Sequence, residues 1–88
     1  MKDKRTNNNN RSRLDIIADI LEASIGKIKK TQLMYRCNLS FKQVELYLSF
    51  LLERKLLCQV DGDAGAFRIT EKGKRFLEAY KGLLGLIS

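Results

Sequence analysis

The fold is decided by residues 30–44, which read KTQLMYRCNLSFKQV. The first half of this stretch, residues 30–37, is predicted to form a short helix bounded by an asparagine. Its apolar side chains Leu33, Met34 and Cys37 fall on one face of that helix. We therefore expect this face to be buried against the rest of the domain.

A complete capping signal marks the start of the next helix, which is predicted over residues 41–55. Ser40 precedes this helix and Gln43 follows three residues later, so each side chain can accept a hydrogen bond from the other residue's backbone N–H. Leu39 and Val44 have the spacing of a hydrophobic staple around the same start. Two short helices separated by three residues are typical of a helix-turn-helix.

Upstream of this motif, a helix is predicted over residues 13–25. Ser12 and Asp15 form a variant of the capping box, and Gly26 is expected to end the helix. Its apolar stripe is predicted to contain Leu14, Ile17, Leu21 and Ile25, joined by Ile16 and Ile20.

After residue 56 the apolar pattern changes from helical spacing to alternation. Residues 57–60 and 66–69 are predicted to be two strands, and residues 61–65, with two aspartates and two glycines, are predicted to be the turn between them. We expect Cys58 and Val60 to share one face of this hairpin.

A last helix is predicted to open at Thr70 and Glu71. Gly73, Phe76, Tyr80, Leu83 and Ile87 follow one another at steps of three and four residues, which is the spacing of a coiled-coil seam. Leu77 and Leu84 form a second stripe beside it. We expect one stripe to complete the core of the same chain and the other to pair with a second copy.

The order helix, helix, turn, helix, hairpin, helix predicts a winged helix-turn-helix. The fold class is mainly α with a small β-hairpin. Residues 1–11 are interpreted as a disordered basic arm, residues 12–70 as the domain, and residues 71–88 as a dimerisation helix.

The chain is strongly basic, with 17 lysines and arginines against 10 acids among 88 residues and a formal charge of +7. The positive residues cluster in residues 1–13, 27–42 and 68–75. This distribution predicts one basic side and a polyanionic partner such as nucleic acid.

Several functional classes find no support in the composition. The chain has no histidine and two cysteines, so no zinc site or nucleophile–base pair is expected, and both cysteines are predicted to be small buried residues. Asp61 and Asp63 resemble the opening of a calcium loop, but Gly65 and Lys72 stand where oxygen ligands belong. We expect no enzyme, cofactor, small-molecule ligand or membrane segment, and a cytoplasmic, nucleoid-associated protein.

Residues 14–23 and 30–41 resemble the small archaeal winged-helix DNA-binding proteins, including the chromatin-associated Sulfolobus type. Residues 47–48, 51–52 and 69–73 continue this resemblance. The resemblance covers residues 12–80. It implies a homodimer on double-stranded DNA, with the second helix of the motif in the major groove and the hairpin beside it. The last helix ends at Ser88, too early for the long antiparallel coil of that type.

Side chains on the first turns of the major-groove helix read base edges, while helix N-termini and nearby cations bind phosphate. On this basis Lys42 and Gln43 are candidates for contacting base edges. The start of the preceding helix is a candidate phosphate-binding site. The candidate DNA contacts are Arg11, Arg13, Lys29, Lys30, Thr31, Arg36, Ser40, Lys42, Gln43 and Arg68. The candidate dimer contacts are Phe76, Tyr80, Leu83, Leu84 and Ile87.

Alternatives remain at several positions. Gln43 can serve only as a cap, and the lysines can be solvated surface charges. Tyr35 is interpreted as a core residue. For Tyr47 both a place in the core and a hydroxyl contact with phosphate stay open. Leu46 and Phe50, one helical turn apart, favour a second hypothesis, in which the same fold binds a protein rather than DNA. RNA binding is a third hypothesis, although no aromatic platform is evident.

Overall fold

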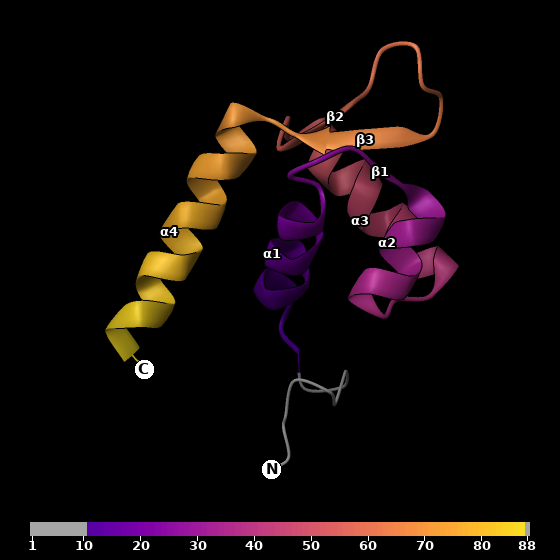
Figure 1. Ribbon diagram of the computed structural model, residues 1–88. Coiled ribbons are helices and arrows are strands. Elements are labelled where there is room, and N and C mark those ends of the chain that lie inside the picture. The colour runs from indigo at the N-terminus through magenta and orange to yellow at the C-terminus, as the bar shows by residue number, and fades with distance from the viewer. Residues whose placement is uncertain (1–10, 88) are drawn as a thin grey trace.

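The structure is a computed structural model that describes residues 11–87, and within this range it contains four helices and a small sheet (Figure 1). The elements in chain order are α1 (Arg13–Ala23), β1 (Ile28–Lys29), α2 (Lys30–Cys37), α3 (Phe41–Glu53), β2 (Leu57–Gln59), β3 (Ala66–Ile69) and α4 (Glu71–Ile87). The fold is mainly helical and carries a small antiparallel sheet, as the sequence predicts.

Helix α1 is buried along one side and starts with the predicted capping box between Ser12 and Asp15. It ends at Ala23, two residues before the predicted end at residue 25. The reason is Ser24, which is fully buried, donates from its hydroxyl to the Ile20 carbonyl at 2.7 Å and accepts at its own carbonyl from the Ile69 N–H at 2.8 Å. This bond to the sheet turns the chain out of the helix, and Ile25 is consequently exposed rather than part of the buried stripe.

The helix-turn-helix is formed by α2, residues 38–40 and α3. Asn38 has a left-handed backbone, with φ of 55°, and its N–H bonds back to the Met34 carbonyl. The capping box at the start of α3 is present, because the Ser40 hydroxyl accepts from the Gln43 N–H at 3.1 Å and the Gln43 side chain accepts from the Ser40 N–H at 3.0 Å. Both predicted helices of the motif therefore begin at the expected residues, and α3 ends two residues before the predicted end.

The sheet has three strands in the order β1-β3-β2, one more than the predicted hairpin. The added strand, β1, pairs Ile28 with Phe67 and Lys29 with Ala66. The face of β2 differs from the prediction: Leu57 is buried and Cys58, opposite Arg68, is exposed. The expectation that Cys58 is a buried residue is therefore wrong. A strand alternates between faces, so placing Leu57 in the core necessarily turns Cys58 to solvent.

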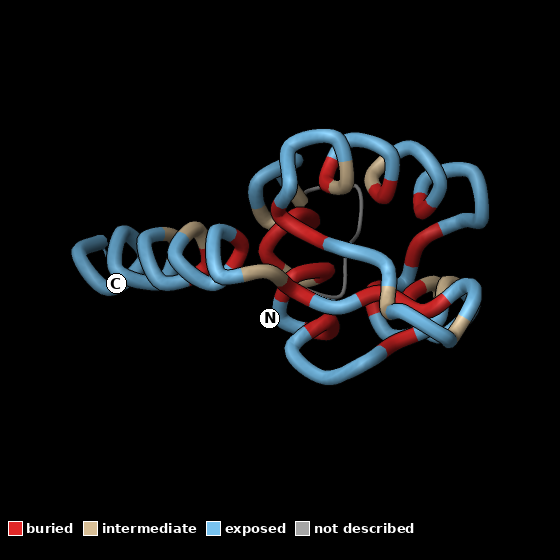
Figure 2. Tube along the Cα trace, turned by 90° about the horizontal axis from the view of Figure 1, so that it is seen from above, coloured by how far each residue is buried: buried red, intermediate tan, exposed pale blue. Residues whose placement is uncertain are grey.

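Helix α4 packs on α1 with its first half and extends away from the body with its second half (Figure 2). Gly73 and Leu77 are buried. Further along α4, the Tyr80 hydroxyl donates to the Asp15 carboxylate, and Lys81 forms an ion pair with Glu22 at 2.9 Å. These contacts fix the direction of α4 relative to α1.

Candidate nucleic-acid interface

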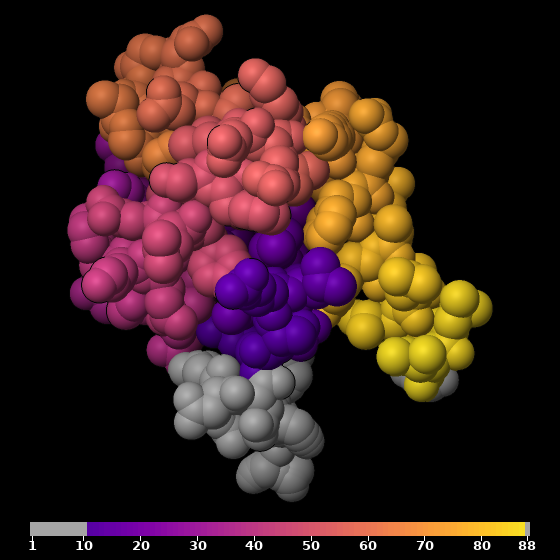
Figure 3. Space-filling view, turned by 180° about the vertical axis from the view of Figure 1, so that it is seen from behind, coloured from indigo at the N-terminus to yellow at the C-terminus, as the bar shows by residue number. Residues whose placement is uncertain are grey.

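Exposed and half-exposed cations follow one another from the first turn of α3, across the start of α2, onto the outer face of the sheet. We call this surface the basic band, and it contains Lys27, Lys29, Lys30, Lys42 and Arg68. The hairpin loop and the starts of α2 and α3 lie on the side of the molecule opposite α4 (Figures 1 and 3). The basic band and the projecting helix are therefore separate surfaces.

At the start of α3, Lys42 and Gln43 are exposed. The side-chain oxygen of Gln43 is used in the capping box with Ser40, which leaves the amide group of Gln43 as its other hydrogen-bonding end. Lys42 has no hydrogen bond or ion pair with any residue that the structure describes. The first turn of this helix therefore presents one cation and one amide to solvent.

At the start of α2, Lys30 is held by two contacts with α3. Its ammonium group lies 3.3 Å from the Glu45 carboxylate and 5.1 Å from the centre of the Phe41 ring. Thr31 is exposed beside it. Lys30 thus links the two helices of the motif, and Glu45 reduces the positive charge of the basic band at this point.

Two lysines of the basic band meet the carboxylate of Asp63 in the hairpin loop. Lys27 Nζ lies 2.8 Å from one carboxylate oxygen and Lys29 Nζ lies 3.3 Å from the other. Hydrogen bonds from Lys27 and then Lys29 lower the pKa of Asp63 below its ordinary value. No ion pair with the hairpin loop was predicted from the sequence, in which Asp61 and Asp63 resemble the opening of a calcium loop.

Arg68 lies on the outer face of the wing (residues 57–69), opposite Cys58. Phe67 and Ile69 on either side of it are buried, so alternation along β3 directs Arg68 to solvent. Lys27 and Lys29 flank buried Ile28 in the same manner. The three cations therefore share the outer face of the sheet.

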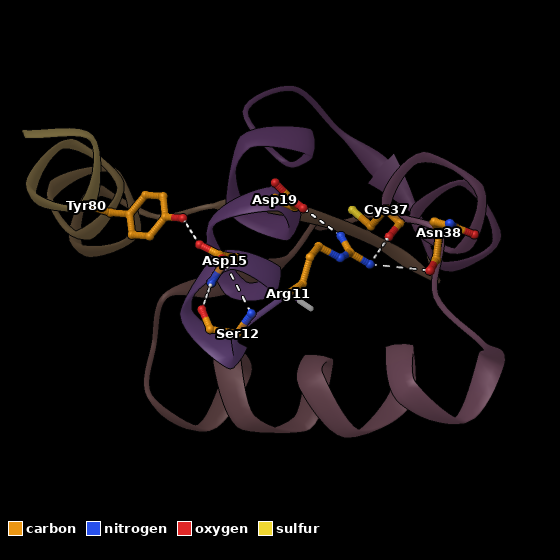
Figure 4. Close-up of polar contacts among 7 residues, drawn as sticks. All are labelled: Arg11, Ser12, Asp15, Asp19, Cys37, Asn38 and Tyr80. Atoms are coloured by element: carbon orange, nitrogen blue, oxygen red, sulfur yellow. Dashed lines mark hydrogen bonds and ion pairs between the residues drawn. The ribbon is translucent and has the colours of Figure 1, made fainter. Parts of the chain in front are cut away.

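Arg11 is part of the folded domain rather than of a disordered arm (Figure 4). Its side chain is 11% exposed and donates to Asp19 at 2.7 Å and to the Cys37 carbonyl at 2.8 Å. These bonds hold the guanidinium between α1 and the end of α2. The predicted arm boundary at residue 11 is therefore corrected, and residues 1–10 lie outside the described residues.

Arg13 and Arg36 are exposed, but they are not part of the basic band. Arg13 borders a hollow of about 280 Å³ that is lined by Ile17, Leu46, Tyr47 and Phe50. Arg36, near the end of α2, borders a larger hollow of about 440 Å³ between α1, α2 and α4. The structure thus separates these two arginines from the cations at the starts of α2 and α3.

Of two side chains on α2 with predicted environments, Tyr35 differs from its prediction and Cys37 agrees with it. Tyr35 was expected in the core and is 83% exposed, so that prediction is wrong. The buried face of α2 is formed by Leu33 and Cys37, and Tyr35 lies two residues from each, on the other side of the helix. Cys37 is buried as predicted, and burial raises the pKa of its thiol to about 11.

The five predicted dimer contacts fall into two groups. Phe76 and Tyr80 are half-buried and pack against the core of their own chain. Leu83, Leu84 and Ile87 are exposed, as is Leu86 beside them. The second half of α4 therefore carries a large apolar surface without a partner among the described residues.

The described residues offer no metal site, since no group of three or more His, Cys, Asp or Glu side chains among them is arranged to hold an ion. Within residues 11–87, no helix is long and apolar enough to cross a bilayer.

The three-helix core, the helix-turn-helix and the adjoining hairpin define a winged helix-turn-helix domain. A family model described as winged helix-turn-helix matches residues 10–87, and the chain belongs to this family. The predicted fold class is thus confirmed.

Two comparisons give relatives of this chain. It is 35% identical over 78 residues to an uncharacterized protein of Methanocaldococcus jannaschii, a match that covers 88% of this chain. The chain spans 36% of the length of that relative. The structure of the present chain is similar to the crystal structure of Sso10a-2, a DNA-binding protein from Sulfolobus solfataricus, with a TM-score of 0.77 and 25% sequence identity. That similarity covers 86% of this chain and 81% of the other. The predicted resemblance to the small archaeal winged-helix DNA-binding proteins is thus confirmed.

Proposed function

We propose that this chain binds double-stranded DNA as a homodimer and acts as a transcriptional regulator or a chromatin-associated protein. The observation that carries the proposal is the first turn of α3, where Lys42 and the Gln43 amide are exposed at one end of the basic band. The similarity to Sso10a-2, described as a DNA-binding protein, supports it. A cytoplasmic, nucleoid-associated location is part of the same proposal.

In this proposal α3 enters the major groove and the wing lies along the adjacent backbone. Lys42 contacts a phosphate or a guanine, and the Gln43 amide is the candidate for reading a base. Lys29, Lys30, Thr31 and Arg68 contact phosphates, which supply affinity without sequence information. Arg11 has an internal structural role, so it is not part of the proposed interface.

The proposal is tested by comparing single variants with a matched control. Lys42→Ala and Arg68→Ala each remove one cation of the basic band and are expected to weaken binding to a random duplex about three- to tenfold. Arg75→Ala removes an equally exposed cation from α4 and is expected to change affinity less than twofold. Fluorescence anisotropy with a labelled duplex measures these affinities. Equal losses for all three variants would refute the proposed docking face.

A second candidate function is protein binding through α3. Leu46 is 66% exposed and, with Phe50, borders the hollow of about 280 Å³ next to α1. Two large apolar side chains on the exposed side of a helix are typical of a protein contact. This candidate is favoured if the chain shows no affinity for any duplex at low salt, and disfavoured if Leu46→Lys binds duplex normally and remains an unchanged dimer.

A further inference from the structure

The cluster formed by Lys27, Lys29 and Asp63 has the geometry of an occupied anion site. Each oxygen of one carboxylate meets a different ammonium group, at 2.8 Å and 3.3 Å. A backbone phosphate also presents two unbridged oxygens, and charge-assisted hydrogen bonds from two lysines suit it equally. The pair of lysines is thus a suitable site for a phosphate, with a carboxylate of the same chain bound in it.

The backbone, rather than the ion pairs, holds Asp63 in position. Its N–H donates to the Val60 carbonyl at 3.2 Å, and its carbonyl accepts from the Ala66 N–H at 3.1 Å. Gly62 and Gly65 on either side have φ of 77° and 82°, which a turn of this shape requires. Removing the charge of Asp63 should therefore leave the loop intact.

The two lysines owe their position to the sheet. Lys27 immediately precedes β1 and Lys29 lies in it, so the two lysines flank buried Ile28 and are directed away from the core. Lys29 pairs in register with Ala66, three residues after Asp63. Both lysine side chains are about half exposed, at 51% and 55%. Ion pairs at such sites are screened by water and contribute little to the stability of a fold. Replacement of the Asp63 carboxylate by another anion therefore costs little free energy.

We propose that Lys27 and Lys29 form a DNA phosphate-binding site for which the carboxylate of Asp63 competes, so that the wing weakens its own chain's binding to DNA. The inference rests on the proposed function. It adds Lys27 to the interface and assigns Asp63 the role of an internal competitor that sets affinity. At neutral pH the carboxylate is ionised, as an ordinary aspartate is. Hydrogen bonds from Lys27 and then Lys29 lower its pKa further.

The test compares Asp63→Asn with Asp61→Asn in the full chain. Both changes remove one negative charge from the same loop, but Asp61 forms no ion pair with any described residue. We expect Asp63→Asn to raise duplex affinity about three- to tenfold at ~0.1 M salt and to steepen the log–log salt slope by about one to two. Asp61→Asn is expected to change affinity less than twofold and to leave the slope unchanged.

A triple variant that adds Lys27→Ala and Lys29→Ala to Asp63→Asn is expected to lose the whole gain. Equal effects of the two aspartate variants, or weaker binding by Asp63→Asn, would overturn the inference while leaving the proposed function in place. If neither the wild-type chain nor any variant binds duplex at low salt, the proposed function fails together with the inference. Thermal unfolding of each variant confirms that the loop change has not altered the fold.

Discussion

Arg11 joins three parts of the chain that are distant in sequence. Its guanidinium connects the segment before α1 to Asp19 in α1 and to the carbonyls of Cys37 and Asn38 at the end of α2. The carbonyls at a helix C-terminus have no partner within the helix, so a buried cation there satisfies them and complements the negative end of the helix dipole. Arg11 therefore stabilises the helix-turn-helix itself.

Replacing Arg11 by alanine is expected to lower the free energy of unfolding by about 2 kcal/mol, because it removes half-buried hydrogen bonds to the Asp19 carboxylate and the Cys37 carbonyl. Arg13→Ala, two residues later and exposed, is expected to change it by no more than about 0.5 kcal/mol. Urea denaturation followed by circular dichroism measures both. An Arg11→Ala chain that unfolds like the wild type, yet binds duplex more weakly, would instead support the role of a DNA-binding arm.

Individual environments were the part of the fold least predictable from sequence. The alternation in residues 57–60 is equally compatible with either face being buried, and a shift of one residue exchanges Leu57 and Cys58. Tyr35 was assigned to the core from its aromatic character, although the eight-residue helix α2 buries only Leu33 and Cys37. In short elements, tertiary packing decides the buried face, and the local pattern does not contain that information.

At the scale of elements, the start of α4 depends on a close approach at Gly73. A Cβ there would lie 2.3 Å from the Leu56 carbonyl oxygen and 2.7 Å from an Ile69 side-chain carbon. The Thr70 hydroxyl caps this turn, accepting from the Gly73 N–H at 3.0 Å and donating to the Lys55 carbonyl at 2.7 Å. Only glycine lets α4 approach the Leu56 backbone, between α3 and β2, this closely.

Gly73→Ala is accordingly expected to destabilise the chain by about 1–3 kcal/mol, the usual cost of overpacking a tight contact. Gly82→Ala, in the same helix with open space around it, is expected to stabilise it by up to about 1 kcal/mol through helix propensity. Thermal unfolding of the two variants gives opposite shifts in Tm on this account. A Gly73→Ala chain as stable as the wild type would show that α4 does not pack on residue 56 in this manner.

Elements with strong terminal signals were predicted well. The capping boxes at Ser12 and Ser40 fixed the starts of α1 and α3, because side-chain hydrogen bonds at a helix start are local and readable from four residues. Strand β1 was not predicted, since two residues show no period. It forms only because β3 offers a free edge, which is a property of the assembled sheet.

At the scale of the whole molecule, the hairpin loop and the starts of α2 and α3, from which the basic band is built, lie on the side opposite the second half of α4 (Figure 1). A monomer with an exposed apolar helix end is expected to pair with a second copy. In our proposal this leaves both basic bands free, because dimerisation through α4 does not cover the starts of α2 and α3. The cations of the band were predicted from charge clustering, but their partners Glu45 and Asp63 depend on folding and were not.

The dimer proposal is tested by two variants of the same chemical change. Leu83→Lys places a charge in the exposed apolar surface of α4 and is expected to convert the dimer to a monomer, because an unpaired charge is costly to bury. Leu46→Lys makes the same change on α3 and is expected to leave the dimer intact. Sedimentation equilibrium distinguishes them. If Leu46→Lys dissociates the dimer and Leu83→Lys does not, the dimer interface lies on α3 rather than on α4.

The central claim is tested most directly by a salt titration of the wild-type chain on a random duplex and on the DNA upstream of its own gene. We predict measurable binding at low salt, with a log–log slope of about −5 to −7 for a dimer that makes about five to eight phosphate contacts. The same affinity and slope on both duplexes would indicate chromatin-type packaging, and about a thousandfold preference for the upstream site would indicate a local regulator. No binding to either duplex at low salt would contradict the account.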